Sequence, residues 1–375
     1  MKLDISNNGI TSLGEYFETY KGNIDEIEEL WCDNNQLTSL EGCPPHLKKL
    51  WCAYNQLTSL QGCPPTLKEL RCSGNQLTSL EGCPPNLEKF WCSGNQLTSM
   101  EGCPSNLRKL DCSDNRLTSL EGCPPNLKIL LCNNNQLTSL EGCPSNLELL
   151  SCSGNQMTSL NGCPPNLEKL WCGSNQLTSL QGCPPNLKEL LCKNNHLTSL
   201  EGCPVTLEIL WCENNHLTSL QGCPPNLEIL TCDNNQLTSL EGCPPNLEKL
   251  YCTGNQLTSL EGCPANLEKL YCSDNHLTSL EGCPPNLEEL YCDGNPLSAE
   301  WNGLSKKQIR EKLKLQSFLR GIHKVNHLTN WKWRLVRRFC NNLLDLWYAP
   351  DENGVAPYAL WTYKKFQQEC AAVEN

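Results

Sequence analysis

The chain has 375 residues and carries 29 Lys and Arg against 41 Asp and Glu, a formal net charge of -12 at pH 7. Its 29 Cys, 25 Gly and 25 Pro, set against 5 Phe and 3 Met, indicate one short unit copied many times. No stretch approaches the roughly 20 apolar residues of a membrane helix, and the first residues lack the apolar core of a signal peptide. We therefore expect an intracellular, cytoplasmic protein with reduced thiols and no membrane partner.

The N-terminal segment, residues 1–29, is predicted to be a degenerate first repeat and cap. Its apolar and Asn positions from Leu3 to Leu13 follow the pattern of the units that come later. After Leu13 the aromatic residues Tyr16, Phe17 and Tyr20 are spaced like those of a short amphipathic helix. Such a helix would cover the first turn, because terminal repeats must close the core.

Residues 30–297 hold fourteen copies of one 20-residue unit without an insertion, counted by the Cys at every twentieth position from Cys32 to Cys292. Aligned on residues 47–65, the unit reads L-x-x-L-x-C-x-x-N-x-L-T-S-L-x-G-C-P-P. A period of this length predicts a solenoid, in which each copy is one structural turn.

The letters L-x-x-L-x-C-x-x-N-x-L resemble the leucine-rich-repeat consensus. The 20-residue length resembles the short repeats of bacterial effector proteins. The monotony of N-Q-L-T-S-L-E-G-C-P-P-N-L, with its flanking Cys, is similar to repeat proteins of giant DNA viruses such as the marseilleviruses. The resemblance implies a leucine-rich-repeat solenoid with a parallel sheet on its concave face. It also implies a viral protein in the host cytoplasm or the virion.

Each turn is predicted to send alternate residues of a short strand into the core. Leu50 and Cys52 point inward and Trp51 outward, as a strand with one buried face requires. Leu47, Leu57, Leu60 and Cys63 complete the inside. Because no single turn can bury these side chains alone, stacking at about 4.8 Å per turn makes the core.

The remaining fixed letters are predicted to shape the bends of each turn. The Asn column from Asn8 to Asn295 would satisfy backbone groups of its own turn and the next as a buried ladder. Gly62 allows a backbone shape that other residues resist, and Pro64-Pro65 favours an extended path. We therefore expect a mostly helix-free convex face.

Residues 298–375 are predicted to form a small, basic, helical C-terminal cap. From residue 299 onward there are 13 Lys and Arg against 7 Asp and Glu, whereas the preceding residues hold 16 against 34. Ser305 to Gln308 resemble a capping box that opens a helix with Ile309 and Leu313 inward. A second helix would run through Trp333 and Trp347, and a third from Pro357 to Phe366.

The two Cys columns, Cys32 to Cys292 and Cys43 to Cys283, suggest either disulfide ladders or reduced core residues. We favour the second interpretation, because buried Cys is a small hydrophobe and spacing alone does not make a disulfide. The Cys gaps of eleven and nine residues do not fit zinc-finger spacing. His196 and His216 share a column that is mostly Gln, so no metal or cofactor is predicted.

The outward strand position is the candidate binding site, because it varies while the scaffold letters stay fixed. Exposed aromatic groups on a concave sheet are typical of a recognition surface, although stacking between adjacent rings could instead stiffen the sheet. The predicted binding residues are Trp31, Trp51, Arg71, Trp91, Trp171, Trp211, Tyr251, Tyr271 and Tyr291.

The functional prediction is a protein–protein interaction module whose partner and oligomeric state the sequence leaves open. The main alternative is a structural component of a virion or assembly. A ubiquitin-ligase-like effector is disfavoured, because Cys340 lacks the nearby Asp spacing and lies on an inward helical face. Nucleic-acid binding through Arg334, Arg337 and Arg338 ranks lower, since a solvated helix face explains the same letters. No catalytic residues are predicted, and we do not expect an enzyme.

Overall fold

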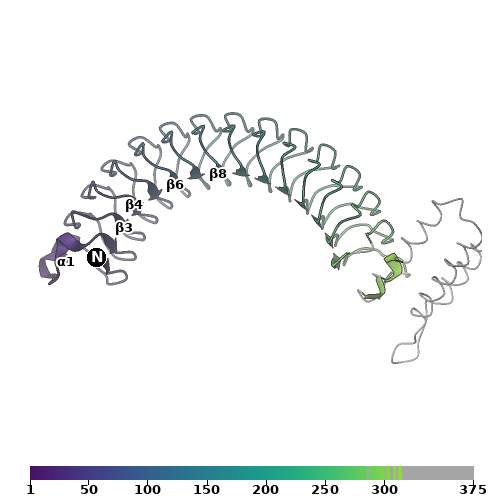
Figure 1. Ribbon diagram of the computed structural model, residues 1–375, viewed down its shortest axis with the longest axis horizontal. Helices are drawn as coiled ribbons and strands as arrows, with labels where there is room; N and C mark the ends of the chain where they lie inside the picture. The colour runs from purple at the N-terminus through teal and green to yellow at the C-terminus, as the bar shows by residue number, and fades with distance from the viewer. Residues whose placement is uncertain (285–286, 300, 305–306, 310, 315–375) are drawn as a thin grey trace, which may run out of the picture.

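A computed structural model describes residues 1–284, 287–299, 301–304, 307–309 and 311–314. These residues form one sheet of 15 parallel strands in chain order. Figure 1 shows the turns stacked into an arch with the strands along its inner side. The strands are β1 (Lys2–Asp4), β2 (Glu29–Trp31), β3 (Lys49–Trp51), β4 (Glu69–Arg71), β5 (Lys89–Trp91), β6 (Lys109–Asp111), β7 (Ile129–Leu131), β8 (Leu149–Ser151), β9 (Lys169–Trp171), β10 (Glu189–Leu191), β11 (Ile209–Trp211), β12 (Ile229–Thr231), β13 (Lys249–Tyr251), β14 (Lys269–Tyr271) and β15 (Glu289–Tyr291).

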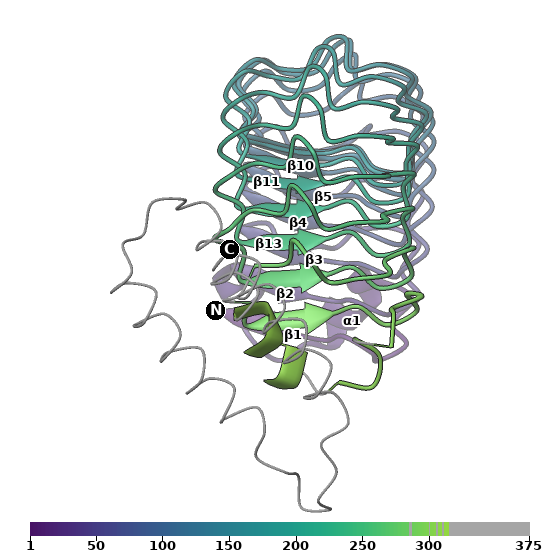
Figure 2. The ribbon, with the colours of Figure 1, turned by 90° about the vertical axis from the view of Figure 1, so that its right-hand side faces the viewer.

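Neighbouring strands pair residue for residue, so equivalent letters of the repeat lie beside one another. Leu30 pairs with Leu50, and Trp31 pairs with Trp51. The same register continues to the last pair, where Tyr271 meets Tyr291. Figure 2 shows the strands following one another in a single layer. The predicted leucine-rich-repeat solenoid with a concave parallel sheet is confirmed.

The core is a set of stacked Leu columns with a Cys column beside them. Leu47, Leu50, Leu57 and Leu60 are fully buried, as are the equivalent side chains of the following turns up to Leu280. Cys52 and its column are buried except for Cys292, whereas the Cys43 column is mostly half-buried and packs against the core. All 27 cysteines from Cys32 to Cys292 are free thiols.

The Asn column is a ladder that ties each turn to the one before it. The side-chain amide of Asn55 donates to the carbonyls of Cys32 and Cys52, and its Oδ1 accepts from the backbone N–H of Leu37. The sequence prediction was wrong in two details. The ladder reaches the preceding turn rather than the next, and Asn8 stands outside it, exposed, with its side chain donating to Ser6.

The N-terminal helix predicted to cover the first turn is confirmed as α1 (Leu13–Thr19). The Ser12 hydroxyl accepts from the backbone N–H of Glu15 and so caps it. Tyr16 and Phe17 pack edge to face, with ring centroids 5.2 Å apart, and Tyr20 joins them against the core. A short 3₁₀ helix, η1 (Ile24–Glu26), then leads into β2.

At the other end, helical residues cover the last turn. Residues 307–309 and 311–314 are helical, and Ile309 and Leu313 are buried as predicted. Trp301 is buried beside them, and the ammonium of Lys312 lies 4.0 Å from its ring centroid. The second and third predicted helices lie outside the described residues. The division into residues 1–29, 30–297 and 298–375 remains a proposal.

Over the described residues of the turns, the convex side carries no helix, as the Pro-rich letters predicted. Gly62 adopts a φ of +89°, and a Cβ there would lie 2.7 Å from the Leu40 carbonyl carbon of the preceding turn. This close approach requires glycine.

Within the part of the chain that the structure describes, no helix is long and apolar enough to cross a membrane.

Candidate functional site on the concave face

The predicted binding residues all occupy the last position of their strands and form one column along the concave sheet. Their exposure is uneven. Arg71, Trp211 and Tyr291 are exposed, whereas the other six side chains are half-buried because neighbours in the column cover part of each ring. The column is divided into three groups rather than forming one uniform surface.

The first group is a stack of rings and cations at the N-terminal end. Trp31 and Trp51 lie face to face, with centroids 4.3 Å apart and planes 9° apart. The ammonium of Lys2 covers Trp31 at 2.9 Å from its ring centroid, and the guanidinium of Arg71 lies 5.8 Å from that of Trp51. Both outer faces of this pair are therefore occupied by cations of the chain itself.

The second group is a stack of three tyrosines at the C-terminal end. The ring of Tyr271 lies 4.6 Å from both Tyr251 and Tyr291, at interplanar angles of 22° and 15°. Its hydroxyl donates to the Glu289 carboxylate, which also forms an ion pair with Lys269. This hydrogen bond raises the pKa of Tyr271 to about 12. The three tyrosines thus form a stacked platform with polar edges.

The third group comprises tryptophans in the middle of the column that lack a ring partner beside them. Trp171 pairs in register with Ser151 and Leu191, and its indole N–H donates to Glu189 at 2.9 Å. Trp211 pairs with Leu191 and Thr231, and 38% of its surface is exposed. Trp211 therefore offers more open aromatic surface than the stacked tryptophans.

The sequence analysis missed Tyr54, an exposed aromatic residue just beyond the column. Tyr54 has a φ of +56° and 61% of its surface is exposed. A Cβ on Gly74 would lie 2.6 Å from the Tyr54 ring, so the glycine of the next turn makes room for it. Most equivalent positions hold Asn, Asp or Gly, which tolerate positive φ. Tyr54 is the single aromatic residue in that column of the repeat, and this sequence feature could have identified it.

A second column of outward side chains lies two residues beyond the first and was also missed. It contains Asp33, Glu213 and Asp233, which are half-buried. Partial burial raises the pKa of all three carboxyl groups, as the largest cause in each case. These carboxylates lie on the same side of the sheet as the aromatic column.

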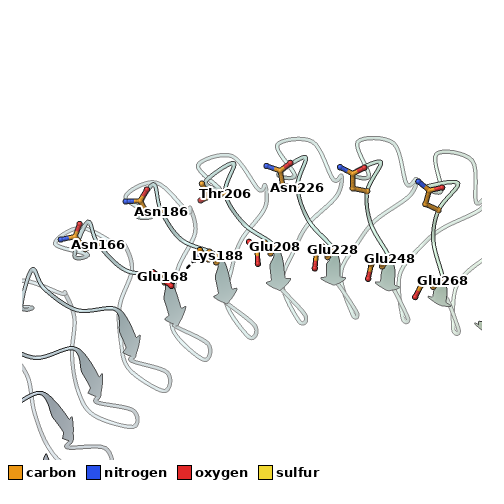
Figure 3. A pocket seen from close by; sticks show the side chains of 12 residues that line it. Asn166, Glu168, Asn186, Lys188, Thr206, Glu208, Asn226, Glu228, Glu248 and Glu268 are labelled. Atoms are coloured by element: carbon orange, nitrogen blue, oxygen red, sulfur yellow. Dashed lines mark hydrogen bonds and ion pairs between the residues drawn. The ribbon is translucent and has the colours of Figure 1, made fainter.

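A polar groove runs along one flank of the arch, with a volume of about 1030 Å³. Figure 3 shows Asn166, Asn186 and Asn226 near the outer loops, and the Glu column close to the strands. The complete lining is Asn166, Glu168, Asn186, Lys188, Thr206, Glu208, Asn226, Glu228, Asn246, Glu248, Asn266 and Glu268. The sequence analysis did not predict this groove.

The two histidines that share a column, His196 and His216, stack against each other. His196 and His216 lie parallel, 5.7 Å apart, and Gln236 contacts His216. Over the residues that the structure describes, no cluster of three or more His, Cys, Asp or Glu side chains is arranged to hold a metal ion.

The comparisons with known proteins agree with this geometry. The family model for leucine-rich repeats in two copies matches residues 225–264 and 265–306. YopM from Yersinia enterocolitica is 37% identical, with a TM-score of 0.67, over 73% of this chain and 61% of that one. YopM from Yersinia pestis, described as a leucine-rich effector protein, is 32% identical with a TM-score of 0.64, over 73% of this chain and 79% of that one.

The chain therefore belongs to the leucine-rich-repeat family. Its match spans less than two thirds of the Y. enterocolitica protein. The functional domain of InlJ from Listeria monocytogenes, which includes a cysteine ladder, shares the fold at 23% identity and a TM-score of 0.59, over 76% of this chain and 70% of that one. The comparison with curated proteins found no match. The similarity to viral repeat proteins remains a prediction.

Proposed function

We propose that this protein is a binding module whose concave column contacts a protein partner. Leucine-rich-repeat folds commonly mediate protein–protein interactions. The observation that supports this particular face is the contrast within each strand. The inward Leu positions are nearly invariant and fully buried, whereas the outward position varies and exposes part of eight aromatic rings. Aromatic side chains of this kind are enriched among interface hot spots.

The same geometry supports binding rather than catalysis. The flank groove is open and lined by amides, carboxylates, one Lys and one Thr, so the lining lacks the Cys, Ser or His that nucleophilic catalysis uses most often. The Trp31–Trp51 pair is covered by cations on both outer faces, which leaves its ring edges rather than its faces for a partner. Base stacking, and hence nucleic-acid recognition, needs free faces.

The proposed location is the cytoplasm. Free thiols along the whole solenoid fit a reducing compartment. The thiols of the Cys52 column lie in the core, where burial disfavours the thiolate and raises their pKa. The coil therefore does not depend on oxidation for its packing.

The test is an affinity pull-down followed by binding measurements on three triple variants. The first replaces Trp31, Trp51 and Trp91 by Ala, and the second replaces Tyr251, Tyr271 and Tyr291. Each buried hot-spot aromatic is worth about 2 kcal/mol or more, so at least one of these variants should bind the recovered partner far more weakly. Replacing the exposed convex residues Gln181, Gln221 and Glu261 is the matched control, and it should bind like the parent.

Because the rings stack, far-ultraviolet circular dichroism and thermal unfolding must show that each triple variant is folded. If the partner bound both aromatic variants as tightly as the parent, the concave face would not be the site. The structural-component alternative predicts the opposite pattern, in which the convex variant alone loses association with a particle or assembly.

A further inference from the structure

Trp211 differs from Trp31, Trp51 and Trp91 in having no cation of the chain on its ring. Lys2 covers Trp31, Arg71 lies near Trp51, and Lys109 lies 5.5 Å from the ring centroid of Trp91. Among the described residues, no such contact is present at Trp211, which is also more exposed than these three rings. Its ring is therefore open to a cation from outside the chain.

Two carboxylates lie beside this ring on the same side of the sheet. Alternation along the chain places Glu213 on the concave side with Trp211, at about 6.6 Å along the strand direction. The backbone N–H of Asn214 donates to the carbonyl of Asp233 at 2.9 Å, which continues the parallel ladder and aligns Glu213 with Asp233. The ring and both carboxylates thus face one small region spanning two turns.

The chain satisfies these carboxylates only in part. One oxygen of Glu213, Oε2, is buried and has no hydrogen-bond partner. Asp233 accepts one hydrogen bond, from the backbone N–H of Thr253 at 2.6 Å. Burial raises the pKa of Glu213, and the charge of Asp233 raises it further. A positive charge placed here would stabilise both ionised groups.

The nearest cation of the preceding turn, Lys193, compensates the Glu213 carboxylate only in part. A Cβ on Gly173 would lie 3.1 Å from Cγ of Lys193, so the base of this side chain lies over the turn that precedes its own. Its charge lowers the pKa of Glu213 only as the least of the named causes. Among the described residues, neither Glu213 nor Asp233 forms an ion pair.

The chain shows elsewhere that a tryptophan of this column holds a cation. In the second turn, Trp31 is followed two residues later by Asp33, the same spacing as Trp211 and Glu213. There the Lys2 ammonium sits over the ring, while Asp33 accepts from the backbone N–H of Ala53 at 2.7 Å. An aromatic ring of this column thus accommodates an ammonium group in this fold.

We propose that Trp211, Glu213 and Asp233 form a subsite for a guanidinium or ammonium group, supplied by an Arg or Lys side chain of the protein partner. The cation lies over the indole ring, and the two carboxylates pair with it from the side. This subsite rests on the proposed function, because it names one chemical feature that a partner of the concave face must carry.

The test uses the peptide acetyl-Arg-Arg-Arg-amide as the probe, with binding measured by calorimetry on the full chain. Trp211→Leu and the double variant Glu213→Gln with Asp233→Asn should each lower the affinity about tenfold, because each removes one half of the subsite. The matched control is Glu248→Gln with Glu268→Gln, which removes the same charge from the flank groove. The control should change the affinity less than twofold.

The double variant reports on charge, and Trp211→Leu reports on the ring without changing the charge. Because Trp211 is exposed, its replacement keeps the test decisive if the double variant unfolds. Equal losses in the subsite and control variants would mean general attraction to an acidic protein and would overturn the proposal, as would failure of the peptide to bind. The triple variants described above leave all three subsite residues intact, so failure of the concave-face proposal is distinguishable from failure of the subsite.

Discussion

The side chain of Asn155 accepts a hydrogen bond from the backbone N–H of Leu137, at 3.0 Å, and thereby links two consecutive turns. The same amide donates to the carbonyls of Cys132 and Cys152 at 3.1 and 2.9 Å. All of these groups are buried between turns, where water cannot replace a lost partner. The ladder is therefore a stabilising element at every joint of the solenoid.

Asn155→Ala should lower the free energy of unfolding by about 1–3 kcal/mol for each backbone group left unpaired. Urea unfolding followed by circular dichroism measures the change. The control is Gln156→Ala, whose side chain is exposed next to it, and this variant should remain within about 0.5 kcal/mol of the parent. Equal effects of the two substitutions would show that the ladder contributes nothing specific.

The glycine that follows each outer bend allows a comparison between two positions with the same backbone shape. Gly62 and Gly102 have φ values of +89° and +84°, but a Cβ would meet backbone at 2.7 Å in the first and 3.5 Å in the second. Both Ala variants carry the cost of a positive φ, of order 1–2 kcal/mol. Gly62→Ala should therefore be destabilised more than Gly102→Ala, and this difference should appear as a lower melting temperature of the Gly62→Ala variant. Equal melting temperatures would contradict the role of close approach.

The thiols should react slowly in the folded protein. Burial raises the pKa of Cys83 to about 12, so only a minute fraction is thiolate at neutral pH. A thiol reagent added to anaerobically purified protein should therefore label few cysteines until denaturant is added, and then nearly all 29. Mass-spectrometric detection of turn-to-turn disulfides in protein from a reducing cytosol would refute the reduced-core interpretation.

Replacing Glu213 should stabilise the protein at neutral pH and not at acidic pH. Burial raises the folded-state pKa of this carboxyl above its unfolded value, so its ionised form costs stability, and the cost disappears as the pH falls through the folded pKa. Glu213→Gln should therefore have a higher melting temperature than the parent at neutral pH and an equal one at low pH. Thermal unfolding across this pH range measures the difference. If the two melting temperatures differed by the same amount at neutral and at low pH, the charge of the Glu213 carboxylate would not be the cause of the destabilisation.

Removing the C-terminal segment should expose the apolar end of the last turn. Trp301, Ile309 and Leu313 are buried there, and Leu304 packs against the same core. A chain ending at Pro296 should therefore associate end to end and lose solubility. Light scattering of the truncated and full chains makes the comparison. A truncated chain that stayed monomeric and equally heat-stable would identify residues 298–375 as an independent domain.

The sequence alone determined the scaffold, because its letters repeat with a fixed period. A single turn cannot bury Leu50 and Cys52 or pair the Asn55 amide by itself. These side chains therefore require periodic stacking of the turns. The helix through Tyr16 and Phe17 was also predictable, since its spacing is local. In the last turns, the inward positions of Ile309 and Leu313 followed from helical periodicity.

Only the tertiary structure decided which side chains of neighbouring turns contact one another. The amide of each ladder Asn donates to a carbonyl of the preceding turn. The repeat letters alone do not say whether the neighbouring partner lies in the preceding or the following turn. The aromatic column is divided into groups because each ring's exposure depends on the residue twenty positions away, which covers Trp31 but leaves Trp211 open. The position of Lys2 over Trp31 and the orphaned oxygen of Glu213 likewise depend on contacts between turns, whose geometry the stacking alone creates.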